Sequence, residues 1–476
     1  MAKQDYEVVI GLETHAELST KTKIFCSCST EFGGEANSHC CPICTAMPGA
    51  MPVLNEKVVE YAVKAGLATN CKITEFGWQD RKNYFYPDMP SGYQVSQAKE
   101  HICKEGFVEI ETENGTKPIR LIEIHIEEDA GKLNHGEKGG SLVDLNRAGV
   151  PLIEIVSYPD LRSAEEVEIY LRTLKSILEY IEVSDCKMQE GSLRADINIS
   201  VRKKGAKEFG PKVEMKNMNS FKFIVEAIKY ESNRQIEEIE AGKEVVSETV
   251  RWDDINGETI PMRDKDSLAY RPFPDPNLLP IILTDEYIKN IKNSLPELPT
   301  SRRKRYVQEL GIPEYDANII TTSKFLSNLF ELGAKTCGNA KAISNLIITD
   351  ILKVINDTGI EPEEIKFTGE QLGKLVNLVE KGTISNSISK KVLVEMFENP
   401  KDPEKIVEEK GLVQISDEGA IKEVVKKVIA ANPGSVADYK AGKDKALGFL
   451  VGQAMKETKG KANPGMLNEM LKEELK

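Results

Sequence analysis

A group of cysteines near the N-terminus is the most specific chemical signal in the sequence. Five of the nine cysteines fall within nineteen residues, in the pattern FCSC-x11-CCPIC. Two short turns, Cys26-x-Cys28 and Cys41-Pro-Ile-Cys44, can each present two thiolates, and four thiolates form a structural Zn²⁺ site. Cys40 is left out of the zinc site, because the side chains of the neighbouring Cys40 and Cys41 diverge. The alternatives to a zinc site are a redox pair and a chance group of buried thiols. Four thiolates leave no position for a substrate, so the predicted zinc stabilises a loop and does not catalyse a reaction.

Acidic residues in several strand-like segments could hold a second kind of cation. Glu13 and His15 are two residues apart, which places them on one face of a strand, although such pairs also occur on ordinary solvated faces. Three consecutive acids, Glu127-Glu128-Asp129, repel one another unless they are solvated or share a cation. Glu154 lies in an apolar run, where a carboxylate is costly to bury without a partner. Two further carboxylates lie in strand-like stretches, namely Asp196 and Glu214.

Several carboxylates and one histidine on strands favour Mg²⁺ over zinc. Mg²⁺ bound by carboxylates usually retains waters and binds substrate phosphates, so the pattern indicates phosphoryl transfer. The sequence contains neither Gly-x4-Gly-Lys-Ser/Thr nor Gly-x-Gly-x-x-Gly, and an ATP site would therefore depend on a sheet and its carboxylates. In residues 80–97, Arg81 and Lys82 could contact phosphates while nearby aromatic rings stack on a base. The residues alone favour the alternative, a proline-stiffened loop whose aromatic side chains pack on the core.

Length and composition describe a protein of two to four domains without a membrane span. The 476 residues are 40% hydrophobic and 29% charged, and no apolar run approaches eighteen residues. The cysteines are odd in number and clustered, which argues against a secreted disulfide framework. The N-terminus lacks the features of a signal peptide, so we expect a cytoplasmic protein. The net charge is −13, yet residues 421–463 carry nine lysines and four acids. This local excess of +5 fits either a phosphate-contacting module or a solvated helix face.

The hydrophobic pattern predicts an α+β protein whose sheet precedes its helical part. Alternation predicts strands at residues 7–18 (interrupted at Gly11), 119–127 and 195–201. Serines predict two helix starts: Ser163 caps a helix to about residue 181, and Ser220 caps one that ends near residue 241. Beyond about residue 295 the pattern is helical, including a helix over 421–429 and a last helix that Asn463-Pro464 begins. Two prolines in residues 397–404 predict a linker into a small helical module.

Six motifs, in this order, give the chain a family resemblance: GLETH, DRKNYFYPDMPSGYQVSQ, EEDAGK, VDLNRAGVPLIEIVSYPD, EGSLRADINIS and EMKNMNSF. Together they resemble the B-subunit family of the aspartyl/glutamyl-tRNA amidotransferases, and the resemblance covers essentially the whole chain. The tail, from ISDEGAIKEVVKK to LGFLVGQAMKETKGKANPGMLNEML, is similar to the YqeY-type helical domain of that family. The zinc cysteines occur in only some members, so the resemblance does not make zinc a requirement for activity.

The resemblance implies a fold of three domains. It predicts a sheet-containing cradle, or kinase, domain at residues 1–294, an all-α helical domain at 295–405 and a small all-α tail domain at 406–476. The cradle would hold the aminoacyl end of the tRNA, and the tail would contact the body of the tRNA. With this implied role, phosphate contact becomes the favoured interpretation of the +5 region.

The resemblance also implies a reaction, a set of site residues and two partner proteins. The B-type chain would use ATP and Mg²⁺ to phosphorylate the side-chain carboxylate of misacylated Glu-tRNA(Gln) or Asp-tRNA(Asn), and ammonia would then displace phosphate to give the amide. The amidotransferase A-type partner would supply ammonia by hydrolysing glutamine or asparagine, and the C-type partner would hold the other two together in a heterotrimer. Lys82 would contact phosphate, and the metal and kinase site would comprise Glu13, His15, Glu128, Glu154, Asp196 and Glu214.

Two other functions compete with an ATP-dependent amidotransferase component. A zinc-containing tRNA adaptor without catalysis would explain the cysteines and the basic tail, but it has no need for convergent acids. A standalone small-molecule kinase would explain the acids, but it has no need for a tRNA-type tail.

Overall fold

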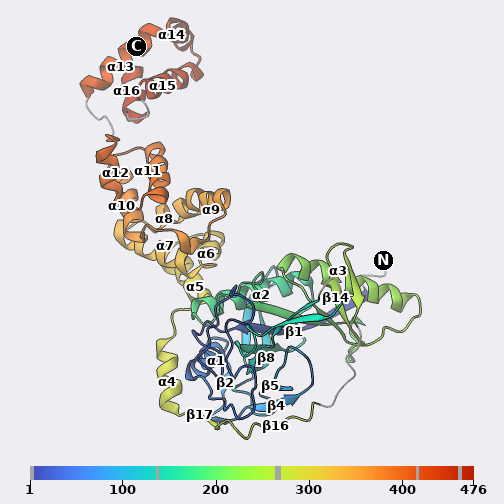
Figure 1. Cartoon of the computed structure of the whole chain (residues 1–476). Coiled ribbons are helices and arrows are strands. Elements are labelled where there is room, and N and C mark those ends of the chain that lie inside the picture. Colours follow the sequence, from blue (N-terminus) through green and yellow to red (C-terminus); the bar gives the residue numbers. More distant parts are fainter. Residues whose placement is uncertain are drawn as a thin grey trace. The chain divides into compact units, whose positions relative to one another are not determined.

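The computed structural model describes residues 5–135, 139–262, 270–413, 418–458, 462 and 464–475 (Figure 1). The chain divides into two compact units, residues 1–298 and 299–476. The first unit contains the sheets and the second is helical, which confirms the predicted α+β class. In the described residues, no helix is both long and apolar enough to cross a membrane.

One large sheet organises the first unit. Its strands follow the order β15-β14-β13-β12-β1-β11-β8-β6-β2, and β7 pairs with β8 outside this path. All named pairs in this sheet are antiparallel except β13 with β14. The strand bounds are β1 (Tyr6–Glu17), β2 (Lys72–Ile73), β6 (Cys103–Lys104), β7 (Phe107–Thr112), β8 (Gly115–Glu128), β11 (Pro151–Ser157), β12 (Leu193–Lys203), β13 (Val213–Lys216), β14 (Glu248–Asp253) and β15 (Glu258–Pro261).

The predicted alternation of β1 is confirmed. Leu12, Thr14 and Ala16 are buried, and the intervening Glu13, His15 and Glu17 occupy the opposite, half-buried face. The predicted interruption at glycine 11 is wrong, because β1 continues through this residue in register with β12. Alternating side chains place one face of a strand in the core and leave the other for polar groups.

The alternation predicted for β8 holds only at its C-terminal end. The alternation predicts Ile122, Ile124 and Ile126 on one face of the strand. Ile124 and Ile126 are buried, whereas Ile122 is exposed and Leu121 is buried instead. The pairing register shifts here, because Val156 faces Glu123 while the next residue of β11 faces Leu121. An extra residue of this kind forms a β-bulge and reverses the alternation of the side chains before it.

Three helices pack with the apolar face of the sheet in one core. They are α1 (Glu56–Ala68), α2 (Ala164–Tyr180) and α3 (Phe221–Glu240). Both predicted caps are confirmed, since the Ser163 hydroxyl accepts from the Glu166 N–H and Ser220 accepts from the Phe223 N–H. A fourth helix, α4 (Asp285–Ser294), contacts α1.

Short strands complete the first unit. The segment with Lys82 forms a three-stranded sheet in the order β16-β4-β5, from β4 (Asp80–Asn83), β5 (Tyr93–Ser96) and β16 (Phe273–Pro274). The expectation that its aromatic rings pack on the core is wrong for Phe85, which is 91% exposed. Two further pairs join β3 (Phe76–Gly77) with β17 (Ile281–Ile282), and β9 (Lys132–His135) with β10 (Ser141–Asp144).

The second unit contains two separate apolar clusters. The first includes Ile406, Val407 and Leu412, so it continues past the predicted boundary at 405/406. In the predicted linker at 397–404, only residues 399–402 lie between two helices of this cluster. The second cluster lies within residues 421–475; the predicted helix over 421–429 is confirmed, and Asn463 lies outside the described residues. The elements are α5 (Pro299–Leu310), α6 (Glu314–Ile320), α7 (Lys324–Cys337), α8 (Ala340–Leu346), η2 (Ile347–Ile351), α9 (Leu352–Thr358), η3 (Pro362–Glu364), α10 (Gly369–Glu380), α11 (Asn386–Glu398), α12 (Pro403–Glu409), α13 (Glu418–Ala431), α14 (Pro433–Lys440), α15 (Lys445–Glu457) and α16 (Pro464–Glu474).

Candidate functional site

Three predicted carboxylates meet on the polar face of the large sheet. Glu13 on β1 is directly opposite Asp196 on β12, and Glu214 lies on β13, the next strand. One oxygen from each of the three carboxylates lies within 4.8 Å of the others. Sequence spacing alone could not bring them together, since they are contributed by three strands far apart in the chain.

A lysine that the sequence prediction omitted lies within this carboxylate group. The Lys216 Nζ is 2.9 Å from Asp196 Oδ2 and 3.0 Å from Glu214 Oε1. Burial alone would lower the pKa of Lys216, but the two carboxylates hold it above its usual range. Its position two residues after Glu214 on a strand places both on one face, which was the available signal.

Glu13 carries the clearest sign of crowded negative charge. Burial raises the pKa of this carboxyl, and the charge of Glu154 raises it further. The Asn198 side-chain amide donates a hydrogen bond of 2.9 Å to Glu13 Oε1 and works in the opposite direction. The site is therefore short of positive charge even with Lys216 in place.

A second group forms around Glu154, where three strands adjoin. His15 on β1 and His125 on β8 are each directly opposite Glu154 on β11. Glu154 Oε2 is 3.4 Å from His15 Nε2 and 3.1 Å from His125 Nε2, while Glu127 Oε1 is 3.3 Å from His125 Nε2. Ligand atoms of His15, Glu127 and Glu154 lie within 4.8 Å of one another. Glu154 thus gains the partners that its apolar sequence context required.

The two histidines supply positive charge to this second group. Burial alone would lower the pKa of His125, but Glu123, Glu127 and Glu154 hold it well above its usual range. His15 behaves similarly, because its contact with Glu154 outweighs burial and raises its pKa. The same contacts keep the pKa of Glu154 below its usual range despite burial.

The two groups are neighbours on the same face of β1. Glu13 belongs to one and His15 to the other, and a spacing of two residues along a strand is about 7 Å. The structure therefore divides five of the six predicted metal-site residues between two adjacent groups. His125 and Glu127 complete the second group, although the sequence prediction chose neither.

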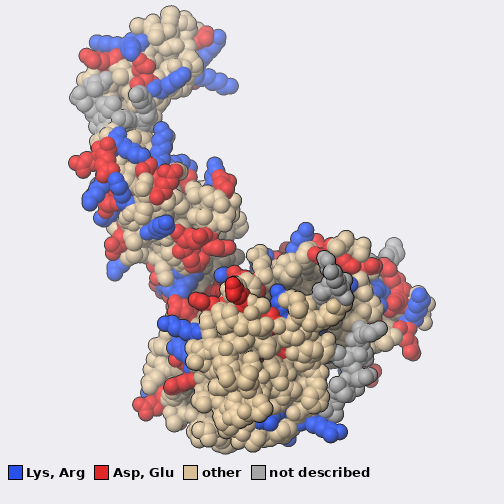
Figure 2. Space-filling view, in the orientation of Figure 1, with Lys and Arg blue, Asp and Glu red and all other residues tan. Residues whose placement is uncertain are grey.

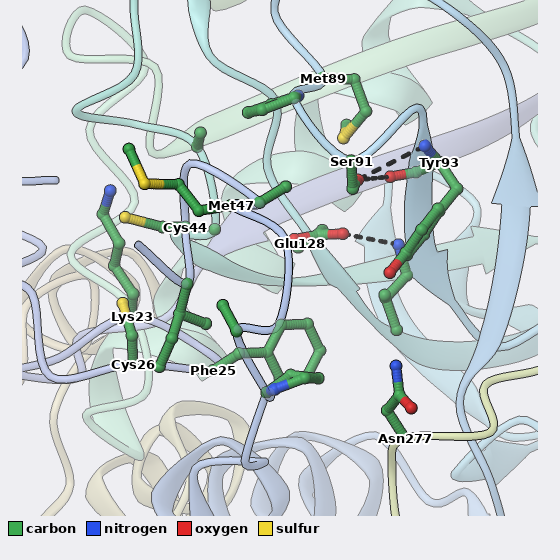
Figure 3. Close-up of a pocket in the computed structure, with 18 of the residues that line it drawn as sticks. Lys23, Phe25, Cys26, Cys44, Met47, Met89, Ser91, Tyr93, Glu128 and Asn277 are labelled. Carbon is green, nitrogen blue, oxygen red and sulfur yellow. Dashed lines mark hydrogen bonds between the residues drawn. The ribbon is translucent and has the colours of Figure 1, made fainter. Parts of the chain in front are cut away.

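Glu128, the sixth predicted residue, lies apart from both groups. It lines a cavity of about 230 Å³ together with Cys26, Cys44 and Tyr93 (Figure 3). Burial raises the pKa of the Glu128 carboxyl to about 8, although the Val95 N–H donates a 2.8 Å hydrogen bond to it. The adjacent Glu127 points to the histidines instead, where the Ser96 hydroxyl donates to it at 2.8 Å.

Lys82 is held beside the second group by the small sheet. It is paired with Gln94 across β4 and β5, and the Gln94 amide is 3.4 Å from Glu127 Oε2. Its ammonium nitrogen is 4.9 Å from the centre of the Tyr270 ring. The structure places Lys82 on this neighbouring sheet, outside both the Glu13 group and the Glu154 group.

The carboxylate group fits a hard divalent cation better than the histidine group does. Glu13, Asp196 and Glu214 offer oxygen atoms alone, which Mg²⁺ prefers, and the Lys216 ammonium already takes the place of a cation between two of them. The second group adds imidazole nitrogen, a ligand more typical of transition metals. Both groups therefore have the charge and donor atoms for a cation.

The cysteines meet as their spacing predicted. Sulfur atoms of Cys26, Cys28, Cys41 and Cys44 lie within 4.8 Å of one another. Cys44 Sγ is 4.0 Å from Cys28 Sγ and 3.9 Å from Cys41 Sγ, close to the ~3.8 Å separation that tetrahedral Zn–S bonds of about 2.3 Å produce. Cys40 Sγ instead lies 4.0 Å from Asn146 Oδ1.

The cysteines of the cluster share their negative charge unequally. A hydrogen bond from Cys26, the Cys41 N–H and the nearby cation of Lys23 lower the pKa of the Cys44 thiol to about 4, whereas burial and the neighbouring cysteines raise the pKa of Cys28 to about 11. Lys23 is fully buried, and its ammonium donates to the Leu145 carbonyl at 3.1 Å. A buried cation offsets part of the negative charge that four thiolates bring to a divalent ion.

Comparison with known proteins gives matches over nearly the whole chain. Residues 8–289 match the GatB/GatE catalytic domain family, and residues 328–475 match the GatB domain family. The chain is 60% identical over 476 residues to the B subunit of the aspartyl/glutamyl-tRNA(Asn/Gln) amidotransferase of Caldicellulosiruptor bescii, covering 99% of both chains. The proteins of the same name from Thermoanaerobacter pseudethanolicus and Clostridium tetani are 57% and 55% identical, again over 99% of both chains.

Proposed function

This chain belongs to the B-subunit family of the aspartyl/glutamyl-tRNA(Asn/Gln) amidotransferases, which are carbon–nitrogen ligases, and we propose that it performs their ATP-dependent step. The proposed substrates are Glu-tRNA(Gln), Asp-tRNA(Asn) or both. The observation that supports a catalytic role is the convergence of two groups of potential cation ligands on one face of β1. A protein that only bound tRNA would have no use for so many half-buried carboxylates.

The proposed reaction turns a poor electrophile into a good one. A side-chain carboxylate oxygen of the misacylated residue attacks the γ-phosphorus of ATP, and the bond to ADP breaks. Ammonia then attacks the carbonyl carbon of the acyl phosphate, gives up a proton and expels inorganic phosphate, which leaves the amide. Most of the catalysis in such transfers comes from positioning and from neutralising negative charge.

The residues of the two groups divide this work. Glu13, Asp196 and Glu214 would hold Mg²⁺, which when bound neutralises phosphate oxygens. Lys216, which now pairs with two of these carboxylates, would be released by the cation and would contact a phosphate oxygen or the substrate carboxylate. His15 and His125 keep Glu154 ionised beside this centre, and Lys82 adds a cation from the small sheet.

The test is amide formation by the heterotrimer reconstituted with the glutaminase (A-type) and C-type partners. Substituting the site carboxylates should stop amide formation and leave tRNA binding unchanged if the chain is the catalytic kinase component. If the chain were a non-catalytic adaptor, the same variants would keep both amide formation and tRNA binding.

We propose that the A-type and C-type partners bind an apolar groove in the first unit. The groove has a volume of about 650 Å³ and lies between the segments at 51–59 and 277–287. Leu279 is 85% exposed there, and Ile282 is 70% exposed. Figure 2 shows a broad area of the first unit with few charged side chains. Exposed apolar surface of this kind usually marks a protein interface.

Charge placed in the groove should prevent assembly. We expect Leu279→Asp combined with Ile282→Asp to weaken association with the two partner proteins at least ~10-fold, since burying two unpaired carboxylates costs several kcal/mol. Ile255→Asp is the matched control, because Ile255 is 89% exposed in the turn between β14 and β15. Co-purification and analytical ultracentrifugation measure the difference. Equal assembly of the wild type and both variants would exclude this groove as the interface.

We propose that the four grouped cysteines bind structural Zn²⁺. Cys44→Ser should lose one equivalent of zinc and lower the melting temperature of the first unit, by roughly 4 °C for a loss of ~2 kcal/mol. Cys40→Ser is the control from the same loop, because this thiol faces Asn146 and not the cluster. Elemental analysis and calorimetry measure the two effects. Loss of zinc in Cys40→Ser alone would contradict the assignment.

A further inference from the structure

A third group of potential ligands lies toward the β6 end of the large sheet and shares His125 with the Glu154 group. His101 precedes β6, and Glu123 and His125 are two residues apart on β8. One ligand atom from each of the three lies within 4.8 Å of the others. Neither the cysteine cluster nor the Glu13 carboxylate group shares a residue with it.

The distances in this group suit a metal ion with nitrogen and oxygen ligands. Glu123 Oε2 is 2.6 Å from His101 Nδ1, and Glu123 Oε1 is 3.6 Å from His125 Nδ1. Tetrahedral bonds of about 2.0–2.1 Å separate neighbouring ligand atoms by about 3.3 Å. The two distances lie on either side of that value, so small side-chain rotations would place all three atoms around one ion.

A buried nitrogen without a hydrogen bond supplies independent support. His125 is only 7% exposed, and within the described part of the chain its Nδ1 has no hydrogen-bond partner. Its Nε2 is already occupied, because it contacts Glu154 and Glu127 at 3.1 and 3.3 Å. Glu123 Oε1, at 3.6 Å, is too distant for a hydrogen bond to this atom, and a metal bound at Nδ1 in place of a proton would satisfy it.

We propose that His101, Glu123 and His125 form a binding site for a divalent transition metal such as Zn²⁺. Two imidazoles and a carboxylate suit zinc or cobalt rather than Mg²⁺, and three ligands leave one position open. Two of the three ligands, His101 and Glu123, line a pocket of about 460 Å³ that also has Thr74 and Glu105 in its wall. A water or a small anionic ligand could complete the coordination there.

The metal would fix the state of His125. A metal bound at Nδ1 leaves the imidazole proton on Nε2, and this N–H is donated to Glu154 or Glu127. Histidine ligands commonly donate their second N–H to a carboxylate in this way, which orients the ring. His125 would therefore connect this site to the neighbouring group. Metal binding itself does not depend on the function proposed above.

Zinc counting on the full-length chain tests the site. After dialysis against Zn²⁺ in excess Mg²⁺, the wild type should retain one more equivalent of zinc per chain than Glu123→Gln or His101→Asn. Glu105→Gln is the control, because Glu105 lies in the same pocket and pairs with Lys72. It should retain as much zinc as the wild type.

Cobalt supplies a readout that a purely structural role would not move. In wild-type chain loaded with one equivalent of Zn²⁺ to fill the cysteines, added Co²⁺ should give visible bands of nitrogen and oxygen coordination, absent in Glu123→Gln. Equal zinc content in the wild type and Glu123→Gln would overturn the proposal. A loss of zinc in Glu105→Gln as large as that in Glu123→Gln would also overturn it. If a variant fails to fold, absence of the cobalt bands in the wild type would overturn it.

Discussion

Replacing Glu13 by glutamine is expected to abolish Glu-tRNA-dependent ATP hydrolysis in the assembled heterotrimer. The substitution removes one negative charge from the carboxylate group but keeps an oxygen that can accept from Asn198. The fold should therefore survive, while the cation that neutralises phosphate oxygens loses a ligand. Removal of one electrostatic contact of this kind typically lowers kcat by about 10²–10³-fold. Steady-state phosphate release measures the change.

Two comparisons make this result specific. Glutaminase activity of the A-type partner should persist, because the substitution leaves the apolar groove intact. Glu208→Gln, at an exposed position outside the helices and strands, should hydrolyse ATP at the wild-type rate. Wild-type turnover in Glu13→Gln would remove the carboxylate group from the proposed mechanism.

Removing three lysine charges from the tail is expected to weaken tRNA binding. Lys426, Lys440 and Lys445 are exposed in the C-terminal part of the second unit, where Figure 2 shows lysine side chains on the surface. If each contacts a phosphate, replacing all three by glutamine should lower affinity roughly tenfold or more at physiological salt. The slope of log K against log salt should fall by about 1 for each lost contact. Filter binding at several salt concentrations measures both quantities.

Glutamine at three exposed lysines of the first unit provides the control: Lys57, Lys222 and Lys229. These replacements should leave the salt slope unchanged, and ATP hydrolysis at saturating tRNA should be unchanged in both triple variants. A wild-type slope in the tail variant would refute tRNA contact by these lysines. Complete removal of residues 406–476 would also cut into the first helical cluster through Ile406 and Val407, so point substitutions are the sharper test.

Residues that follow from local alternation could be predicted from the sequence. Glu13 and His15 lie on the polar face of β1 because Leu12, Thr14 and Ala16 fill the core. The cysteine turns were equally predictable, since their geometry is set within each short segment. Neither feature depends on knowing which strands pair.

Which residues meet in the Glu13 and Glu154 groups depends on the register of the strands, which the sequence does not reveal. Glu127 and Glu128 are adjacent in a run of acids, yet their side chains leave opposite faces of β8, one to His125 and the other to the cysteine cavity. The bulge near Ile122 prevents simple extrapolation of the alternation along that strand. Lys216 shares a strand face with Glu214, but its contact with Asp196 depends on the pairing of β13 with β12.

Oxygen transfer tests the proposed phosphorylation most directly. Glu-tRNA(Gln) labelled with ¹⁸O in its side-chain carboxylate is given to the heterotrimer with ATP and glutamine, and the phosphate released is analysed by mass spectrometry. Attack of the carboxylate on ATP followed by displacement with ammonia predicts one ¹⁸O atom in each phosphate formed with an amide. Amide formation with unlabelled phosphate would contradict carboxylate phosphorylation by this protein.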